Sequence, residues 1–364
     1  ILTISIHFIS FFIGLEILSV SLYALIAYLR NRNHAVESGM KYLMLAAVSS
    51  AFLLFGMALI YMETGSMEFA AIAQSVEKSS SSVLFMMGFG IMLVAIGFKL
   101  ALAPFHLWAA DVYQGAPSPV TAFIATVSKI GVFAVLLRFA QSVNLQQYPL
   151  MMSTFSIIAI ASMIVGNLLA LRQQNIKRLM GYSSIAHFGY LLVAFLPGNT
   201  AGVEAAAFYL IAYSITLLAV FGVISVLSTR MKDAENLAMY KGLFYKRPIL
   251  SAVLIISFLS LAGIPLTAGF IAKFFVLASG VHQHLWLPVI VLVITSVIGL
   301  YYYLRVISTL FAATPSTDSV PKTLHPFFYI TTYITLIIMM IVLCWLGIFP
   351  DSTVEGIRAF LLIR

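Results

Sequence analysis

The sequence predicts an all-α polytopic membrane protein with about ten transmembrane helices, and two observations support this prediction. Of the 364 residues, 62% are hydrophobic and only 9% are charged, whereas soluble domains average about 45–50% apolar and about 25% charged residues. Ten apolar runs are each long enough to cross the hydrocarbon core, and they do not alternate as the strands of a barrel do. This composition excludes a soluble enzyme, a disordered chain and a nucleic-acid-binding protein.

The ten predicted spans follow one another with short connections, and helices are expected because a lipid-exposed backbone must satisfy its own hydrogen bonds. The spans cover residues 2–29, 38–62, 83–109, 117–142, 148–171, 175–197, 201–229, 248–279, 285–312 and 325–349. Residues 63–82, which contain a serine run at 79–82, are predicted to form an interfacial turn. Residues 351–364 are predicted to form an amphipathic tail on the membrane surface.

The positively charged residues are unequally distributed between the two sets of alternating loops. One set contains Lys78 and Arg138, and Arg358 and Arg364 in the tail lie on the same side. The other set contains Arg30, Arg32, Lys41, Arg172, Lys177, Arg178, Arg230, Lys232, Lys241, Lys246, Arg247 and Lys322. Because cytoplasmic loops carry the excess of Lys and Arg, the larger set is predicted to be cytoplasmic. Ile1 and Arg364 are then both periplasmic.

Several classes of site are excluded by the residues present. Cys344 is the single cysteine, so the chain has no disulfide framework and no site built from several thiolates. The sequence contains no P-loop, no GxGxxG motif and no acid or histidine cluster with metal-ligand spacing. We therefore expect no cofactor and no metal in this chain. It opens at Ile1, directly in an apolar run and without a basic signal-peptide region, so we expect the natural N-terminus to be missing.

Four charged residues lie inside predicted spans: Glu16, Lys99, Lys129 and Lys273, with Arg305 a fifth candidate nearer a span end. One ionisable group at mid-membrane costs about 2.5–3.5 kcal/mol, so four would cost about 10 kcal/mol unless they face one another or water. Three lysines to one acid leave at least two lysines without a carboxylate, which argues against static salt bridges. Because burial disfavours a charged amine, such lysines can exchange protons near neutral pH, and the pattern predicts a proton relay.

Two of these lysines lie beside helix breakers. Pro104 follows Lys99 in the segment KLALAPFHLW, and Pro265 precedes Lys273 in the segment LAGIPLTAGFIAKF. A proline removes a helical hydrogen bond, and broken backbone at membrane depth occurs only inside protein or beside a watery cavity. Two such spans, five spans apart, indicate corresponding members of two repeats. His106 and His187 are further relay candidates because imidazole titrates near neutral pH, although each could equally be a hydrogen-bonded core residue.

Five motifs carry a resemblance to a known family: GLEILS, GFKLALAPFHLWAADVYQGAPSPV, ATVSKIGVF, NIKRLMGYSSIAHFGYLLVA and SLAGIPLTAGFIAKF. Together they resemble the antiporter-like membrane subunits of bacterial proton-pumping NADH:quinone oxidoreductase, respiratory complex I. The resemblance covers essentially the whole chain, and the motif that begins at Gly97 is the most specific. The segments KGLFYKRPIL and GLYYYLRV favour the N type of these subunits over the L and M types.

The resemblance implies a fourteen-helix bundle with two inverted five-helix repeats, of which this chain would lack the first four helices. The chain would then be a single transmembrane domain. Residues 1–142 would be the remainder of the first repeat, 148–312 the second repeat, 325–349 the final helix and 351–364 the interfacial tail. By motif, the proton path of the family falls on Glu16, Lys99, Lys129 and Lys273. Glu37 and Lys41, in AVESGMKYL, match a further acid and lysine.

The resemblance also implies a function. The chain would be a proton-translocating subunit of NADH:quinone oxidoreductase in the bacterial inner membrane, bound to lipid and to other membrane subunits and not to nucleic acid. Flavin and iron–sulfur clusters would lie in partner subunits, and no redox chemistry would occur in this chain. Three alternatives remain open: a subunit of a multi-subunit Na⁺/H⁺ antiporter or a membrane-bound hydrogenase, a passive scaffold whose charges only join helices, and a solute carrier.

Overall fold

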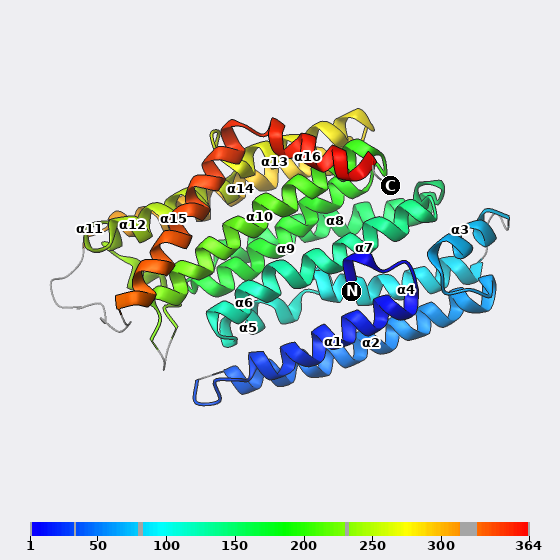
Figure 1. Ribbon diagram of the computed structural model, residues 1–364, viewed down its shortest axis with the longest axis horizontal. Helices are drawn as coiled ribbons and strands as arrows, with labels where there is room; N and C mark the ends of the chain where they lie inside the picture. Colours follow the sequence, from blue (N-terminus) through cyan, green and yellow to red (C-terminus); the bar gives the residue numbers. More distant parts are fainter. Residues whose placement is uncertain (1, 33, 79–82, 230–232, 314–325, 363–364) are drawn as a thin grey trace.

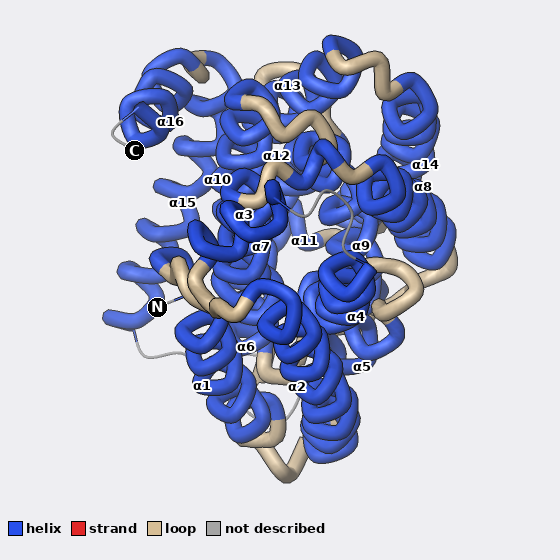
Figure 2. Tube along the Cα trace, turned by 90° about the vertical axis from the view of Figure 1, so that its right-hand side faces the viewer, coloured by secondary structure: helices blue, strands red, loops and turns tan. Residues whose placement is uncertain are grey.

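The computed structural model describes residues 2–32, 34–78, 83–229, 233–313 and 326–362. These residues form long helices that run side by side in one bundle (Figure 1), and the end view shows the helices packed around one another (Figure 2). In chain order the elements are η1 (Leu2–Ile4), α1 (Phe8–Ile26), α2 (Ala35–Thr64), α3 (Phe69–Lys78), α4 (Val83–Leu100), α5 (Leu107–Gly115), α6 (Ser118–Phe123), η2 (Ile124–Ser128), α7 (Lys129–Ser142), η3 (Leu145–Gln147), α8 (Pro149–Leu171), α9 (Ile176–Phe195), α10 (Thr200–Leu227), η4 (Leu237–Tyr240), α11 (Leu243–Lys246), α12 (Pro248–Ala262), α13 (Ala268–His282), α14 (Trp286–Phe311), α15 (Pro326–Ile348) and α16 (Asp351–Leu362).

The prediction of an all-α membrane protein is confirmed. Within the described residues, 8 helical segments are long and apolar enough to cross a membrane. The other two predicted spans correspond to α9, which is more polar, and to the pair α12 and α13, each too short to cross alone. The first helix begins later than predicted, because His7 and Glu68 form an isolated β-bridge that holds the preceding residues outside α1.

Helix α9 lies at the centre of the bundle. Of its 20 residues, all but Arg178 and Tyr182 are buried. Glycines allow α8 to approach it closely: a Cβ at Gly166 would lie 2.6 Å from the backbone nitrogen of Ala186. The other helices therefore separate α9 from the lipid, and it can carry polar side chains that a lipid-facing helix could not.

Both spans that contain a mid-membrane proline are interrupted. Pro104 lies in the connection between α4 and α5, and Pro265 lies in the connection between α12 and α13. Each connection also holds a non-glycine residue in the left-handed region, Ala101 with φ 58° and Leu266 with φ 72°. This conformation is unfavourable for a residue with a side chain, and it persists where the surrounding structure imposes it. The two breaks are therefore defined features of the fold.

The segments outside the spans are more helical than expected. In place of an interfacial turn over residues 63–82, α2 continues to Thr64 and the short helix α3 follows. Phe69, Ile72 and Val76 of α3 are buried at helical spacing, so packing against the bundle stabilises this helix. Residues 79–82 lie outside the described residues. The tail forms α16, and Arg358 donates a hydrogen bond to Glu204 on α10 at 2.9 Å.

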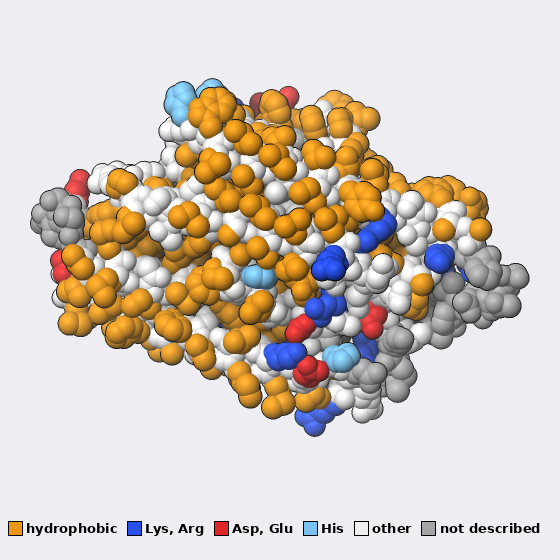
Figure 3. Space-filling view, turned by 180° about the vertical axis from the view of Figure 1, so that it is seen from behind, with side chains coloured by type: hydrophobic (Ala, Val, Ile, Leu, Met, Phe, Trp, Pro, Cys, Tyr) orange, Lys and Arg blue, Asp and Glu red, His pale blue; other side chains and the backbone are white. Residues whose placement is uncertain are grey.

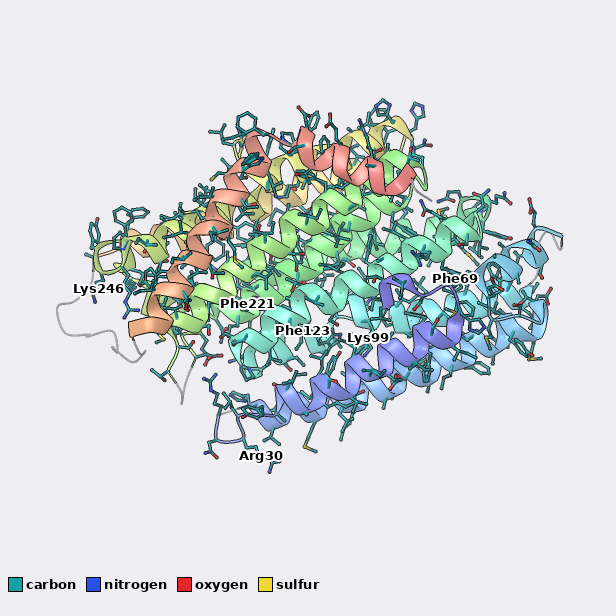
Figure 4. All side chains as sticks on the ribbon, viewed as in Figure 1. Arg30, Phe69, Lys99, Phe123, Phe221 and Lys246 are labelled. Carbon is teal, nitrogen blue, oxygen red and sulfur yellow. The ribbon has the colours of Figure 1, made fainter. Side chains whose placement is uncertain are left out.

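The two ends of the bundle differ in charge. Figure 4 shows Arg30 and Lys246 at one end and Phe69 at the other. On the face drawn in Figure 3, Lys and Arg side chains gather toward one end, and hydrophobic side chains cover most of the remainder. This separation agrees with the charge pattern of the sequence. Ile1, Arg230, Lys232, Lys322 and Arg364, which that pattern also used, lie outside the described residues.

Two cations play a structural part that the sequence did not indicate. Lys177 is among the cations assigned from the sequence to the cytoplasmic loops, but its side chain is fully buried, with 0% of its surface exposed. The Arg305 guanidinium donates hydrogen bonds to the carbonyl oxygens of Leu171 at 2.8 Å and Gln173 at 2.7 Å. Arg305 therefore satisfies the backbone at the C-terminus of α8.

Candidate functional site

Lys99 lies in the last turn of α4, directly before the first break and midway between the two ends of the bundle (Figure 4). Its side chain is 2% exposed, and its amine donates a hydrogen bond to Ser19 Oγ on α1 at 2.6 Å. Glu16, on the same helix as Ser19, accepts a hydrogen bond from Ser50 of α2. Glu16 and Lys99 therefore face the same contact region of three helices, although no direct ion pair joins these two described residues.

Lys129 is the first residue of α7, and the π-helical turn η2 precedes it. Its side chain is fully buried, and Nζ donates a hydrogen bond to Ser184 Oγ on α9 at 2.8 Å. The same oxygen lies 2.7 Å from the hydroxyl of Tyr213 and 3.3 Å from the hydroxyl of Tyr113. A π-turn inserts one residue into the helix and changes the direction of the side chains that follow, and such turns are frequent at functional sites.

Lys273 lies in α13, beyond the second break, and is 8% exposed. Its amine donates a hydrogen bond to the carbonyl oxygen of Ala262, the last residue of α12, at 2.9 Å. A helix C-terminus carries partial negative charge, so the half-helix itself stabilises the ammonium group. Gly263 has φ 82°, and a Cβ there would lie 2.9 Å from Lys273 Cδ, so glycine leaves room for the lysine side chain.

His187 lies between the surroundings of Lys129 and those of Lys273. It is one helical turn from Ser184 on α9, so both side chains lie on one side of that helix. The Nδ1 atom of His187 is 2.6 Å from the hydroxyl of Tyr209, and its Nε2 atom is 3.0 Å from the hydroxyl of Tyr303. The Tyr303 hydroxyl also lies 2.5 Å from Ser183 Oγ. Hydroxyl and imidazole groups, which can both donate and accept protons, therefore surround the region between the two lysines.

Two hollows meet at Lys273. One is a small internal cavity of about 10 Å³, lined by residues that include His187, Tyr209, Tyr213 and Lys273. This volume is at the lower limit of what one water molecule requires. The other is an apolar cleft of about 270 Å³ between α13 and α14, and its lining residues include Phe274 and Val297, which are exposed. The amine of Lys273 thus lies between the interior of the bundle and its outer surface.

Glu37 and Lys41 lie apart from these lysines, at the positively charged end of α2. Lys41 pairs with Glu37 at 2.7 Å and with Asp111 at 3.0 Å, and Arg178 pairs with Asp111 at 2.6 Å. Burial by itself raises the pKa of Asp111, but the hydrogen bonds and charges of Arg178 and Lys41 outweigh it and lower this pKa. The four residues form a partly exposed ion-pair cluster.

His106 precedes α5 directly after the first break, and it is 8% exposed. Its Nδ1 atom is buried and has no hydrogen-bond partner among the described residues. No hydrogen bond or ion pair of the described part of the chain joins His106 to the three lysines. The structure therefore places His187, and not His106, in a hydrogen-bonded group of side chains beside the cavity that Lys273 also lines.

No carboxylate of the described residues lies within 4.0 Å of the amine of Lys99, Lys129 or Lys273. Within the described ranges, the ion pairs within 4.0 Å involve Arg32, His34, Lys41, Lys177, Arg178 and Arg358. Lys99, Lys129 and Lys273 instead contact a serine, a serine and a backbone carbonyl. In the same ranges no three His, Cys, Asp or Glu side chains are grouped so that they could hold a metal ion.

The sequence did not single out the partners of the lysines. Lys99 donates a hydrogen bond to Ser19, and Lys129 donates one to Ser184. Among the candidate histidines, His187 is hydrogen-bonded to Tyr303. Serine and tyrosine are common in apolar helices, so type alone could not identify them. One signal was present: the spacing of Ser184 and His187 places both on one side of α9.

The chain matches a known family over most of its length. The family described as NADH:quinone oxidoreductase/Mrp antiporter, TM matches residues 5–299. NADH-quinone oxidoreductase subunit N of Ectopseudomonas mendocina is 49% identical over 357 residues, which cover 96% of this chain and 71% of that protein. Subunit N of Chromohalobacter salexigens is 50% identical over 311 residues, which cover 85% of this chain and 65% of that protein.

A solved structure is similar as well. A chain of respiratory complex I from Thermus thermophilus, in a structure with bound aureothin, superposes with a TM-score of 0.84 and is 34% identical. The superposition covers 97% of this chain and 76% of that one. The family match over residues 5–299 includes both broken spans and the positions of the four mid-membrane charges.

Proposed function

Because the chain belongs to the NADH:quinone oxidoreductase/Mrp antiporter transmembrane family, we propose that it is a proton-translocating membrane subunit of NADH:quinone oxidoreductase, respiratory complex I. In this role it couples electron transfer from NADH to quinone, which takes place in partner subunits, to the movement of protons across the membrane. The chain spans 65% to 71% of the length of its two subunit N relatives.

One observation carries this proposal: three buried lysines from three different spans form no ion pair with a carboxylate of the described residues. Two of them donate to serine hydroxyls, and Lys273 lines a small cavity together with His187. Lys129 donates to Ser184, and His187 follows one turn later on α9. The small cavity then extends from His187 to Lys273. An amine withdrawn from water loses its proton more readily, so each lysine can accept and release a proton as its surroundings change.

In the proposed path each of the mid-membrane residues has a different part in proton transfer. Glu16 and Lys99, which face the same contact region of α1, α2 and α4, set the proton affinity at one end. Lys129 passes the proton on, and Lys273 exchanges it at the other end. The π-turn before Lys129 and the breaks at Pro104 and Pro265 supply the irregular backbone that such a path requires. His187 belongs to this path through the small cavity that it lines with Lys273, whereas Glu37, Lys41 and His106 remain secondary candidates.

The proposal also covers partners and location. The subunit lies in the bacterial inner membrane against other membrane subunits of the complex, with its positively charged end toward the cytoplasm. Flavin and iron–sulfur clusters belong to partner subunits. Subunits of Na⁺/H⁺ antiporters share the family, but about half of the residues are identical to subunit N of the quinone oxidoreductase, which favours that assembly.

The test replaces Lys129 by methionine, which retains most of the length of the side chain and cannot titrate. Loss of a positioned proton-transfer group slows the transfer about 100-fold or more. We therefore expect the variant to lose most of the proton uptake that this subunit contributes, measured in membrane vesicles and normalised to the amount of assembled complex. Lys241→Met is the matched control, because Lys241 is exposed at the positively charged end. Equal proton uptake by the two variants would exclude the proposed role of Lys129.

A further inference from the structure

The carboxylate of Asp233 forms two ion pairs and accepts a hydrogen bond from a serine hydroxyl. Asp233 follows α10 in the chain and is 8% exposed. Its Oδ1 pairs with Arg32 at 2.5 Å, and its Oδ2 pairs with Lys177 at 2.6 Å. Ser118 Oγ also donates a hydrogen bond to Oδ2 at 3.0 Å. One side chain therefore satisfies two cations and a hydroxyl in a region that is nearly closed to solvent.

These three partners come from three separate parts of the chain, and Asp233 itself belongs to a fourth. Arg32 lies in the connection between α1 and α2, and it also donates to the carbonyl oxygen of Thr229 at 2.9 Å. Ser118 begins α6, and Lys177 lies in the first turn of α9. Lys177 additionally donates to the carbonyl oxygen of Ala116, just before α6, at 2.5 Å. Asp233 thus joins the ends of α1, α6, α9 and α10 at one point.

The joined helices are those that carry the proposed proton path. Helix α6 leads through the π-turn to Lys129, and α9 carries Ser184 and His187 two to three turns beyond Lys177. A helix is stiff along its axis, so a shift at its first turn moves the side chains farther along it. The distance of 2.8 Å between Lys129 Nζ and Ser184 Oγ depends on the relative position of α6–α7 and α9.

We propose that Asp233 is a positioning residue that, through Lys177 and Ser118, holds α6 and α9 in the register at which Lys129 meets Ser184. This inference rests on the proposed function, because it assigns Asp233 a part in the proton transfer through Lys129. Asp233 itself lies outside the path and exchanges no proton in it. A charge is required at this position because Lys177 is fully buried, and a buried ammonium group without a counter-charge forces the surrounding structure to move.

The main variant is Asp233→Asn, studied in the assembled complex in membrane vesicles. A displacement of about 1 Å can slow a transfer step as much as about 100-fold. We expect proton uptake per NADH oxidised to fall severalfold while the amount of assembled complex remains measurable. Glu235→Gln is the matched control: Glu235 lies in the same connection and accepts a hydrogen bond from Asn175 at 2.7 Å, but it pairs with no lysine of the described residues within 4.0 Å. The control is expected to behave like the wild type.

Two further variants keep the inference testable if Asp233→Asn assembles poorly. Asp233→Glu retains the charge and is expected to restore most of the proton uptake per NADH. The double variant Asp233→Asn/Lys177→Met removes the buried charge together with its partner, and it is expected to assemble better than Asp233→Asn alone.

A purely structural role predicts a different result. The variants would then change the amount of complex, but the complex that forms would take up as many protons per NADH as the wild type, and that result would overturn the inference. If Lys129→Met pumps normally, the proposed function itself fails. If Lys129→Met does not pump and Asp233→Asn pumps normally, only the role of Asp233 is refuted.

Discussion

The two broken spans each hold a buried lysine, but they bind its amine with different groups. Each places a lysine beside a proline-containing interruption with one left-handed residue, Ala101 in the first and Leu266 in the second. In the first break the amine of Lys99 is held by a side chain of another helix, Ser19. In the second the amine of Lys273 is held by the carbonyl end of its own interrupted span, Ala262.

This difference determines what can change the state of each lysine. Lys99 depends on the position of α1, which carries both Ser19 and Glu16, so movement of that helix alters its surroundings. Lys273 depends on the geometry of its own break, which moves with it. The first site is therefore suited to sense a motion between helices, whereas the second provides a constant environment next to the cavity and the cleft.

The largest expected effect tests the first site. Lys99→Ala should abolish much of the proton uptake while the complex still assembles, because alanine removes the titrating group together with its desolvation cost. Lys99→Arg should not restore proton uptake, because arginine keeps its charge and cannot release the proton. Proton uptake by vesicles, normalised to assembled complex, measures both variants.

A static salt bridge predicts the opposite order for these two variants. Arginine would then be nearly normal, and alanine would assemble poorly because Glu16 would lose its counter-charge. An arginine variant that pumps like the wild type would show that Lys99 joins helices and does not carry protons.

An intermediate effect is expected at the second site from Gly263→Ala. Alanine at φ 82° costs about 1–2 kcal/mol, and its Cβ would also displace the Lys273 side chain. We expect a lower thermal unfolding midpoint and reduced proton uptake. Gly90→Ala in α4 is the control, because a Cβ there would meet no described residue outside the backbone of its own helix within 4 Å, and helical alanine is favourable. If Gly263→Ala is as stable and as active as Gly90→Ala, the break does not position Lys273 as described.

The smallest expected effect is a loss of stability of α5 at acidic pH. The pKa of Asp111, in the half-helix after the first break, is lowered below its ordinary value of 3.8, because Arg178 and Lys41 outweigh the effect of burial. A lowered pKa stabilises the folded state above that ordinary value, and the stabilisation is lost as the pH falls through the lower folded value. Within the described residues α13 has no ion pair, so acid should loosen α5 before α13. Hydrogen exchange of the two half-helices between neutral pH and pH about 3 measures this difference. Equal protection of both helices at every pH, or an unchanged profile in Asp111→Asn, would contradict it.

The sequence predicted the spans and the positions of the breaks because both depend on local properties. Length and hydropathy identify a span, and Pro104 and Pro265 mark interruptions through the missing hydrogen-bond donor. Charges at mid-membrane were equally visible, because lipid makes each of them costly. These features require no knowledge of which helices are neighbours.

What depends on neighbours could not be predicted in the same way. Nothing in the residues of η2 distinguishes a π-turn from an α-helix, because the difference arises from packing around it. Lys177 resembles a loop cation until the fold brings Asp233 beside it. The partners of Lys99 and Lys129 are serines on other helices, and apolar periodicity does not specify how helices rotate against one another.

The buried central helix has a consequence for how the protein is made. With Lys177 and Arg178 in its first turn and His187 near its middle, α9 is poorly suited to leave the insertion machinery alone, because charged and polar side chains oppose partitioning into lipid. Its close glycine contact with α8 suits release of the two helices together as a hairpin. Even then, Lys177 and His187 lack the partners that Asp233, after α10, and Tyr303, in α14, later provide. Helix α9 is thus inserted before the segments that contact its buried polar side chains, and these contacts can form only after residues later in the chain have been translated.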